Sequence, residues 1–198
     1  MARTQAYNRV EALESAMALF WRKGYHATSM KDLEGALRMR PGSIYAAFKS
    51  KENLFTEALD LYFERGQQSL SNQIDQEKDG IAALEAHLRS FVPDGAVPDH
   101  PQACMIVKAI LETSVPSPTL ADHARILFNK ARKGFQQVFE MAQAKGDIAE
   151  SHDPVQLARK YQADITTLRL GNHIAAGSEN NKELADIFIQ NLNALRKS

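Results

Sequence analysis

A short segment in the first quarter of the chain, residues 40–51, groups side chains that suit contact with a polyanion. It contains basic and hydroxyl groups within twelve positions: Arg40, Ser43, Tyr45, Lys49 and Lys51. Side chains of these types contact DNA phosphates, and arginine also reads the edge of guanine. Residues 1–55 hold nine basic and five acidic side chains, a net charge of +4, although the whole 198-residue chain is neutral. The remainder therefore carries −4, and the basic groups concentrate where a polyanion would bind.

Two short helices joined by a tight turn are expected to position these groups. The spacing predicts helices over residues 29–37 and 41–48, with Ser29 and Asp32 as a variant of the capping box. Gly24 is expected to end a preceding helix. Apolar residues on the three helices would form one core: Leu13, Met17, Phe20, Leu33, Leu37, Ile44 and Phe48. The outward side chains of the last helix would be Arg40, Ser43, Tyr45, Ala46, Ala47 and Lys49. This layout predicts a helix-turn-helix, although spacing alone also fits an ordinary helical hairpin.

Helical periodicity continues through the rest of the chain, and no sustained strand-like alternation occurs. Ser50 is expected to cap a long helix that carries Leu54, Ala58 and Leu61 on one stripe. Further helices are expected at about 80–91, 103–114, 118–145, 154–176 and 182–196, with a proline-rich loop at 93–101. We therefore predict an all-α fold. It would comprise an N-terminal three-helix helix-turn-helix DNA-binding domain, residues 1–52, and a larger helical domain for ligand binding and dimerisation, residues 53–198.

Several function classes lack the residues that they need. The longest apolar runs are far shorter than the ~20 residues of a membrane span, and no secretory signal is expected at the N-terminus. The single cysteine, Cys104, excludes an intrachain disulfide and suits a reducing compartment. The six histidines form no helical metal-binding pair, and no nucleophile elbow or phosphate-binding glycine loop occurs. We expect a cytoplasmic protein that is not an enzyme, without metal, cofactor or membrane partner.

Two runs of residues together resemble the pattern of a known protein family. Residues 16–33 (AMALFWRKGYHATSMKDL) and residues 41–54 (PGSIYAAFKSKENL) strongly resemble the TetR/AcrR family of one-component bacterial transcriptional repressors. The match spans residues 9–63 and places these residues at the family's spacing: Phe20, Gly24, Tyr25, Thr28, Leu33, Gly42, Ser43, Tyr45, Phe48, Lys51 and Leu54. The resemblance implies a variable helical ligand domain whose last two helices form a dimeric four-helix bundle.

The resemblance also implies roles for single residues. Ser29 and Tyr45 would hold phosphates, and Lys51 would place a cation on the DNA backbone. Base contacts would come from Arg40, Ser43, Ala46 and Ala47. Two residues depart from the family pattern, because Arg38 stands where the turn usually has a small residue and Arg40 replaces a small hydroxyl cap. A positive φ at Arg38 would cost about 1–2 kcal/mol. Arg40 could read a guanine with two hydrogen bonds.

The sequence gives fewer signals for the residues that would bind an effector. The run Ala103–Glu112 resembles one in a branch of the family that senses electrophiles and oxidants through its cysteine, and Lys108 shares a helical face with Cys104. The alternative is that Cys104 is a small core residue, which the apolar character of its helix favours. We expect effector contacts among polar residues on apolar helices: Cys104, Lys108, Glu112, His123, Tyr161 and Asp164, with His87 as a further candidate. A structural polar role is the alternative for each.

An apolar stripe on the last helix lacks a partner in the sequence pattern and predicts a dimer seam through Leu184, Ile187, Phe188, Leu192 and Leu195. The function that we expect is a homodimeric repressor that binds double-stranded operator DNA and is released by a small-molecule effector. One alternative is a cysteine-based electrophile sensor with the same fold. Another, of a different class, is a helical adaptor that does not bind DNA.

Overall fold

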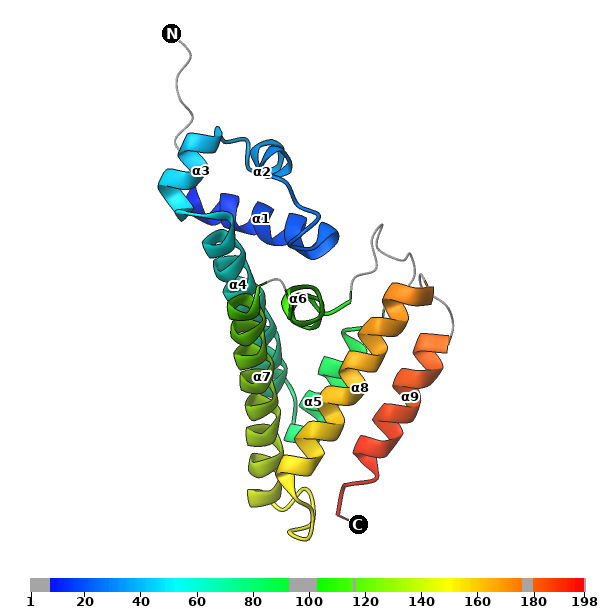
Figure 1. Cartoon of the computed structure of the whole chain (residues 1–198). Coiled ribbons are helices and arrows are strands. Elements are labelled where there is room, and N and C mark those ends of the chain that lie inside the picture. Colours follow the sequence, from blue (N-terminus) through cyan, green and yellow to red (C-terminus); the bar gives the residue numbers. More distant parts are fainter. Residues whose placement is uncertain (1–7, 93–102, 116, 176–179, 198) are drawn as a thin grey trace. The chain divides into compact units, whose positions relative to one another are not determined.

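The computed structural model describes residues 8–92, 103–115, 117–175 and 180–197. Within these residues the chain is helical throughout, apart from turns and an isolated antiparallel bridge between Ile148 and Arg196 (Figure 1). The all-α prediction is confirmed. The helices are α1 (Arg9–Lys23), α2 (Met30–Leu37), α3 (Pro41–Phe48), α4 (Lys51–Gln76), α5 (Gly80–Arg89), α6 (Met105–Thr113), α7 (Pro118–Ala144), α8 (Pro154–Ala175) and α9 (Asn180–Asn193).

The chain divides into two compact units. One unit, which we call the head, comprises residues 1–63 and 105–125, and the other, the body, comprises residues 64–104 and 126–198. The long helices α4 and α7 each contribute to both units. Helix α6 belongs to the head, whereas it lies within residues 53–198, the expected ligand-binding domain. The expected domain boundary after residue 52 lies inside the head, within α4.

Local capping sets the bounds of the first helices in the head. The Asn8 side chain accepts from the amides of the first turn of α1, and Gly24, with a φ of 88°, ends that helix as expected. Ser29 caps α2 in a full capping box, since its hydroxyl accepts from the Asp32 amide and the Asp32 carboxylate accepts from the Ser29 amide. Helix α3 starts at Pro41, where a missing amide hydrogen costs nothing.

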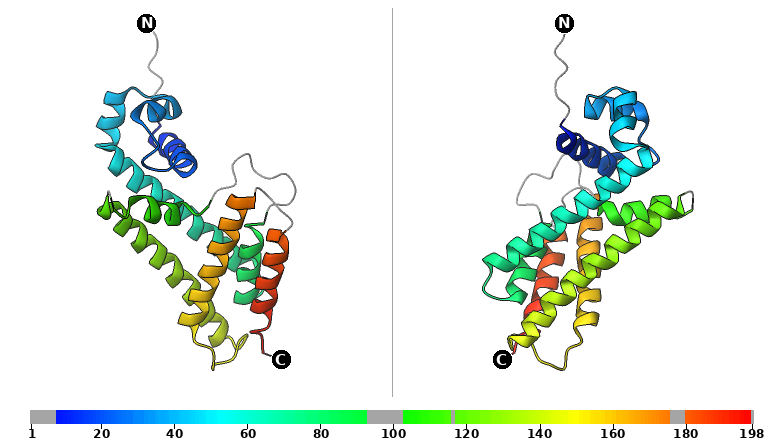
Figure 2. Two further views of the ribbon diagram at one scale, coloured as in Figure 1. Left: turned by 45° about the vertical axis from the view of Figure 1, so that its right-hand side comes forward. Right: turned by 90° about the vertical axis from the view of Figure 1, so that its left-hand side faces the viewer.

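The expected core of the head is present with one difference. Phe20, Leu33, Ile44 and Phe48 are almost fully buried, and Met17 and Leu37 are buried with them. Leu13 is only half-buried, because α1 turns Ala12, Ala16 and Leu19 inward instead. The two views in Figure 2 show α1, α2 and α3 close together at the N-terminal end of α4, whose Leu54 and Phe55 are also buried.

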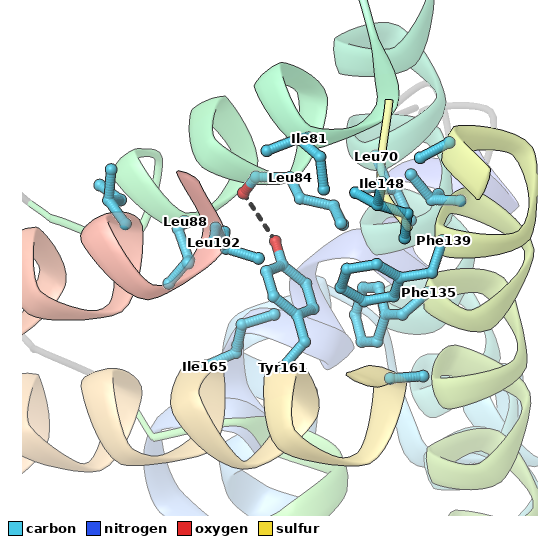
Figure 3. Close-up of a cluster of buried hydrophobic side chains, with 14 of the residues drawn as sticks. Leu70, Ile81, Leu84, Leu88, Phe135, Phe139, Ile148, Tyr161, Ile165 and Leu192 are labelled. Carbon is cyan, nitrogen blue, oxygen red and sulfur yellow. Dashed lines mark hydrogen bonds between the residues drawn. The ribbon is translucent and has the colours of Figure 1, made fainter. Parts of the chain in front are cut away.

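The body packs around one buried tyrosine. Tyr161 of α8 lies among apolar side chains of α5, α7 and α9 (Figure 3). Its hydroxyl donates to the Leu84 carbonyl at 2.8 Å, which satisfies a polar group that would otherwise be costly to bury. Helix α9 contacts both α5 and α8. The loop predicted at 93–101 falls on residues 93–102, which lie outside the described part of the chain.

Candidate DNA-binding surface

Helix α3 has one buried and one exposed face. Ile44 and Phe48 fix it to the head. The residues predicted to meet DNA lie on the other side: Arg40, Ser43, Tyr45, Ala46 and Lys49 are exposed, and Ala47 is half-buried. Tyr45 exposes 49% of its surface, so its ring and hydroxyl are accessible to a partner. The exposed face therefore offers short, hydroxyl and basic groups on a rod that fits a major groove.

Arg40 occupies the N-cap position of α3 without capping it. Its side chain makes no cap hydrogen bond, so the guanidinium is not committed to the helix end. The backbone carbonyl still accepts from the amides of Ser43 and Ile44, at 2.9 and 3.1 Å. Because Arg40 stands where the family has a small hydroxyl residue, a cation lies beside the first turn of α3.

Ser29 is already engaged by its own helix. Its hydroxyl donates to the Asp32 carboxylate at 2.7 Å, so its single proton is in use. Its amide donates to the same carboxylate at 2.8 Å. Lys23 lies 2.8 Å from Asp32, and this hydrogen bond, together with those from Ser29, lowers the pKa of the Asp32 carboxyl far below its usual value. A phosphate contact by Ser29 would have to compete with this network.

Lys51 is held over an aromatic ring. Its ammonium lies 4.5 Å from the centroid of the Tyr25 ring, a cation–π arrangement. Burial lowers the pKa of Lys51, and nearby Asp32 raises it in part. Burial, followed by the charge of Glu52, raises the pKa of Tyr25. Tyr25 was noted in the sequence only for its spacing. Tyr25 lies in the turn between Gly24, which ends α1, and Ser29, which caps α2. This place in the turn is the sequence feature that could have suggested a structural role for Tyr25.

Two expected effector residues lie on α6 and contact the end of α1. Lys108 donates to the backbone carbonyls of Trp21 and Arg22. Glu112 accepts from the Tyr25 amide at 3.0 Å. A third candidate, His123 of α7, contacts the carboxylate of Asp60 on α4 at 2.7 Å. The structure thus places all three in the head and engages each with another part of the same unit.

The remaining polar candidates lie in the body. Tyr161 is fully buried, and Asp164 forms an ion pair of 2.7 Å with Lys160 one turn earlier on α8. His87 lies 2.9 Å from the Tyr161 hydroxyl through its Nδ1 atom. Because Tyr161 spends its proton on Leu84, the hydrogen between His87 and Tyr161 must sit on Nδ1. Burial, followed by the charge of Arg169, lowers the pKa of His87 to about 4.

Cys104 is partly exposed and immediately precedes α6. Among the described residues, no group of three or more His, Cys, Asp or Glu side chains is arranged to hold a metal ion. No helix in this part of the chain is both long and apolar enough to cross a bilayer.

The expected seam residues of α9 do not share one exposure. Ile187 is 52% exposed, whereas Leu192 is buried in the body core. Leu184, Phe188 and Leu195 are half-buried and pack against that core. Helix α8 exposes Leu170 and Ile174 in its C-terminal part, besides Val155 in its first turn.

Known proteins resemble both the head and the whole chain. The family model for bacterial regulatory proteins of the tetR family matches residues 12–58. The HTH-type transcriptional repressor ComR of Escherichia coli (strain K12) is 28% identical over 92% of this chain and 88% of its own. The HTH-type transcriptional repressor DhaR of Mycobacterium sp. (strain GP1) is 25% identical over 96% of this chain and 91% of its own. A cysteine mutant of the TetR family regulator CifR, solved with a 26bp double-strand operator DNA, has a TM-score of 0.84 at 26% identity, over 99% of this chain and 100% of that one.

Proposed function

Since the chain belongs to the TetR family of transcriptional regulators, we propose that it represses transcription as a homodimer on a palindromic operator and is released by a small-molecule effector. One observation carries the proposal: α3 is anchored by Ile44 and Phe48 and turns a face of small, hydroxyl and basic side chains to solvent. CifR, which resembles the chain over its full length, was solved on operator DNA. In a dimer the two copies of α3 would enter successive major grooves, about 34–36 Å apart.

The DNA-binding part can be tested without knowledge of the operator. The full-length protein is used to select duplexes from a random-sequence library, and the affinity of the selected duplex is measured between 50 and 200 mM salt. A protein that neutralises several phosphates should lose at least about a hundredfold in affinity over this range. A palindromic selected sequence supports binding by a symmetric dimer. Failure to enrich any duplex would favour the helical adaptor.

We propose that the dimer seam is formed by α8 and α9. The apolar side chains that a partner would cover are Leu170, Ile174 and Ile187, because these remain exposed on the body surface. Leu192 is a poorer probe, since a charge there would disrupt the core of its own protomer. Ile187→Glu should give a folded monomer with weakened operator binding, whereas Gln137→Glu, at an exposed position on α7, should leave the oligomeric state and operator binding unchanged. A dimeric, fully active Ile187→Glu protein would place the seam elsewhere.

We place the effector in the body, where an unidentified small molecule would favour a conformation that fits the operator poorly. Such a ligand acts through its different affinity for the two conformations. The body residues His87, Tyr161 and Asp164 remain candidates to contact it. A melting screen of the full-length protein against small molecules, followed by operator binding with each stabilising compound, tests this part. A compound that stabilises the protein without weakening operator binding would not be the effector.

A cysteine-based sensor of the same fold is the second candidate. Cys104 is partly exposed and directly precedes α6, whose side chains contact the end of α1. CifR was solved as a cysteine mutant. Mass spectrometry after mild electrophile treatment, together with operator binding by wild type and Cys104→Ser, separates the two. An unmodified Cys104, or a Cys104→Ser protein that no longer binds operator, would reject the sensor.

A further inference from the structure

The C-terminal end of α1 is capped by a side chain that lies more than eighty residues further along the chain. The Lys108 ammonium donates to the carbonyl of Trp21 at 3.3 Å and to that of Arg22 at 3.1 Å. The last carbonyls of a helix have no partner within the helix, and a cation there is also favoured by the helix dipole. The Gly24 amide satisfies the Phe20 carbonyl, and Lys108 of α6 adds partners for the next two carbonyls, those of Trp21 and Arg22.

Glu112, one turn after Lys108, holds the residue that follows this helix end. Its Oε2 atom accepts from the Tyr25 amide at 3.0 Å, and its Oε1 atom lies 3.8 Å from the Lys108 ammonium. A Cβ atom built on Gly24 would overlap the Glu112 carboxylate. The turn between α1 and α2 thus fits closely against the carboxylate only because position 24 is glycine.

Tyr25, whose amide donates to Glu112, also contacts Lys51 through its ring. The Tyr25 ring lies beneath the Lys51 ammonium and packs against Phe55 at 4.9 Å and Phe20 at 6.4 Å between ring centroids. Displacement of the Tyr25 backbone would move the ring away from the Lys51 ammonium and weaken the cation–π contact. Lys51 is the first residue of α4 and one of the predicted phosphate contacts.

We propose that Lys108 and Glu112 are positioning residues for DNA binding. They fix the turn after α1 and, through the Tyr25 ring, hold Lys51 in the place from which it contacts a DNA phosphate. Neither residue touches the DNA. The inference rests on the proposed function, and it takes the place of the effector contacts that the sequence suggested for these two residues.

A double-mutant cycle distinguishes positioning from a general loss of stability. With the duplex selected by the wild-type protein, Glu112→Ala and Lys108→Met should each weaken binding by about tenfold and make the plot of log affinity against log salt less steep by about one unit. In a Lys51→Ala background, Glu112→Ala should change affinity by less than about twofold, because contacts that act through one group do not add. Tyr25→Leu, which keeps the amide and loses the ring, should behave as Glu112→Ala does.

Matched variants serve as controls. Glu112→Gln keeps an oxygen that accepts from the Tyr25 amide and should retain most of the affinity. Asp122→Ala, which removes an exposed carboxylate elsewhere in the head, should have no effect. If Glu112→Ala does not fold, Lys108→Met and Tyr25→Leu carry the cycle. Equal losses with and without Lys51, or no loss in any variant, would overturn the inference. A wild-type protein that selects no duplex would instead overturn the proposed function, before any variant is compared.

Discussion

Arg38 at the C-cap of α2 and Lys49 at the C-cap of α3 both have a positive φ, which glycine favours. Arg38 has φ 53° and ψ 38°, and Lys49 has φ 65° and ψ −50°. Among the described residues, these are the two non-glycine residues with positive φ. Arg38 stands where the family usually has a small residue, and its positive φ is the conformation that a small residue would favour there. Both residues are exposed cations, so α3 is flanked by two positive charges, and each positive φ costs backbone strain.

This strain predicts effects of opposite sign for Lys49→Gly. Glycine should raise the free energy of unfolding by about 1 kcal/mol, because it adopts positive φ without the Cβ clash. The same change should weaken operator binding, because a proposed DNA contact is lost. Thermal melts and affinity measurements on the same preparation check both. Lys49→Ala keeps the strain and should lose affinity without the gain in stability. A Lys49→Gly protein that binds at wild-type strength would remove Lys49 from the DNA-binding set.

Arg38→Gly should likewise raise the free energy of unfolding by about 1 kcal/mol. The amides of Arg38 and Met39 both donate to the Glu34 carbonyl at this turn, and glycine keeps both bonds. Chemical denaturation of Arg38→Gly and Arg38→Ala provides the comparison. A gain in both variants would show that the side chain, not the backbone conformation, costs stability.

Arg40→Ala should relax specificity at one base pair. A guanidinium free of capping duty beside α3 can form two hydrogen bonds to guanine, worth about 1–3 kcal/mol in discrimination. The selected duplex and its single-base variants are compared for wild type and Arg40→Ala. The variant should lose its preference at one position only. A uniform loss on every sequence would make Arg40 a phosphate contact.

Ser29→Ala should affect stability more clearly than specificity. The hydroxyl completes the capping box of α2, and loss of such a cap costs about 1 kcal/mol. Because the hydroxyl proton is committed to Asp32, we expect an affinity loss of no more than about threefold under conditions in which the variant is fully folded. A tenfold loss at full occupancy of the native state would instead support the phosphate role. Ser50→Ala, which removes the hydroxyl that accepts from the Asn53 amide at the start of α4, is the matched cap control.

The lowered pKa of His87 predicts that the body loses stability as the pH falls. Its pKa is lowered to about 4 in the folded protein, against about 6.5 in an unfolded chain, so the unfolded state binds the extra proton between these values. The stabilisation from the neutral ring is present above pH 6.5 and is lost as the pH falls toward 4, by up to about 3 kcal/mol. In His87→Phe the free energy of unfolding should fall less steeply over this range. His26→Gln, at an exposed histidine, should keep the wild-type slope. Equal slopes in all three proteins would assign the acid sensitivity to other groups.

The sequence predicted best what is decided within a few residues. Gly24, the capping box at Ser29 and the cap of α4 at Ser50 were expected and are present, because each depends on neighbours along the chain. The exposed face of α3 followed from helical periodicity together with the family resemblance.

Contacts between distant segments were not predictable in the same way. Lys108 and Glu112 are polar groups on an apolar helix, which suggested a ligand, but their partners are backbone groups near residue 24. The stripe on α9 predicted a dimer seam, and that seam stays a prediction. Periodicity could not tell that α5 and α8 of the same chain cover Leu192. A single sequence shows that a face is covered, and not which segment covers it.

The close fit between Gly24 and Glu112 has a genetic consequence. In a reporter strain repressed by this protein, loss-of-repression alleles should arise at Gly24 as well as on α3, because any added side chain displaces the carboxylate and also strains a φ of 88°. Some of these alleles should be suppressed by shortening the opposing side chain, as in Glu112→Asp, whereas alleles on α3 should not. Position 24 would then behave genetically as a partner of α6, although it belongs to the sequence motif of the DNA-binding helices.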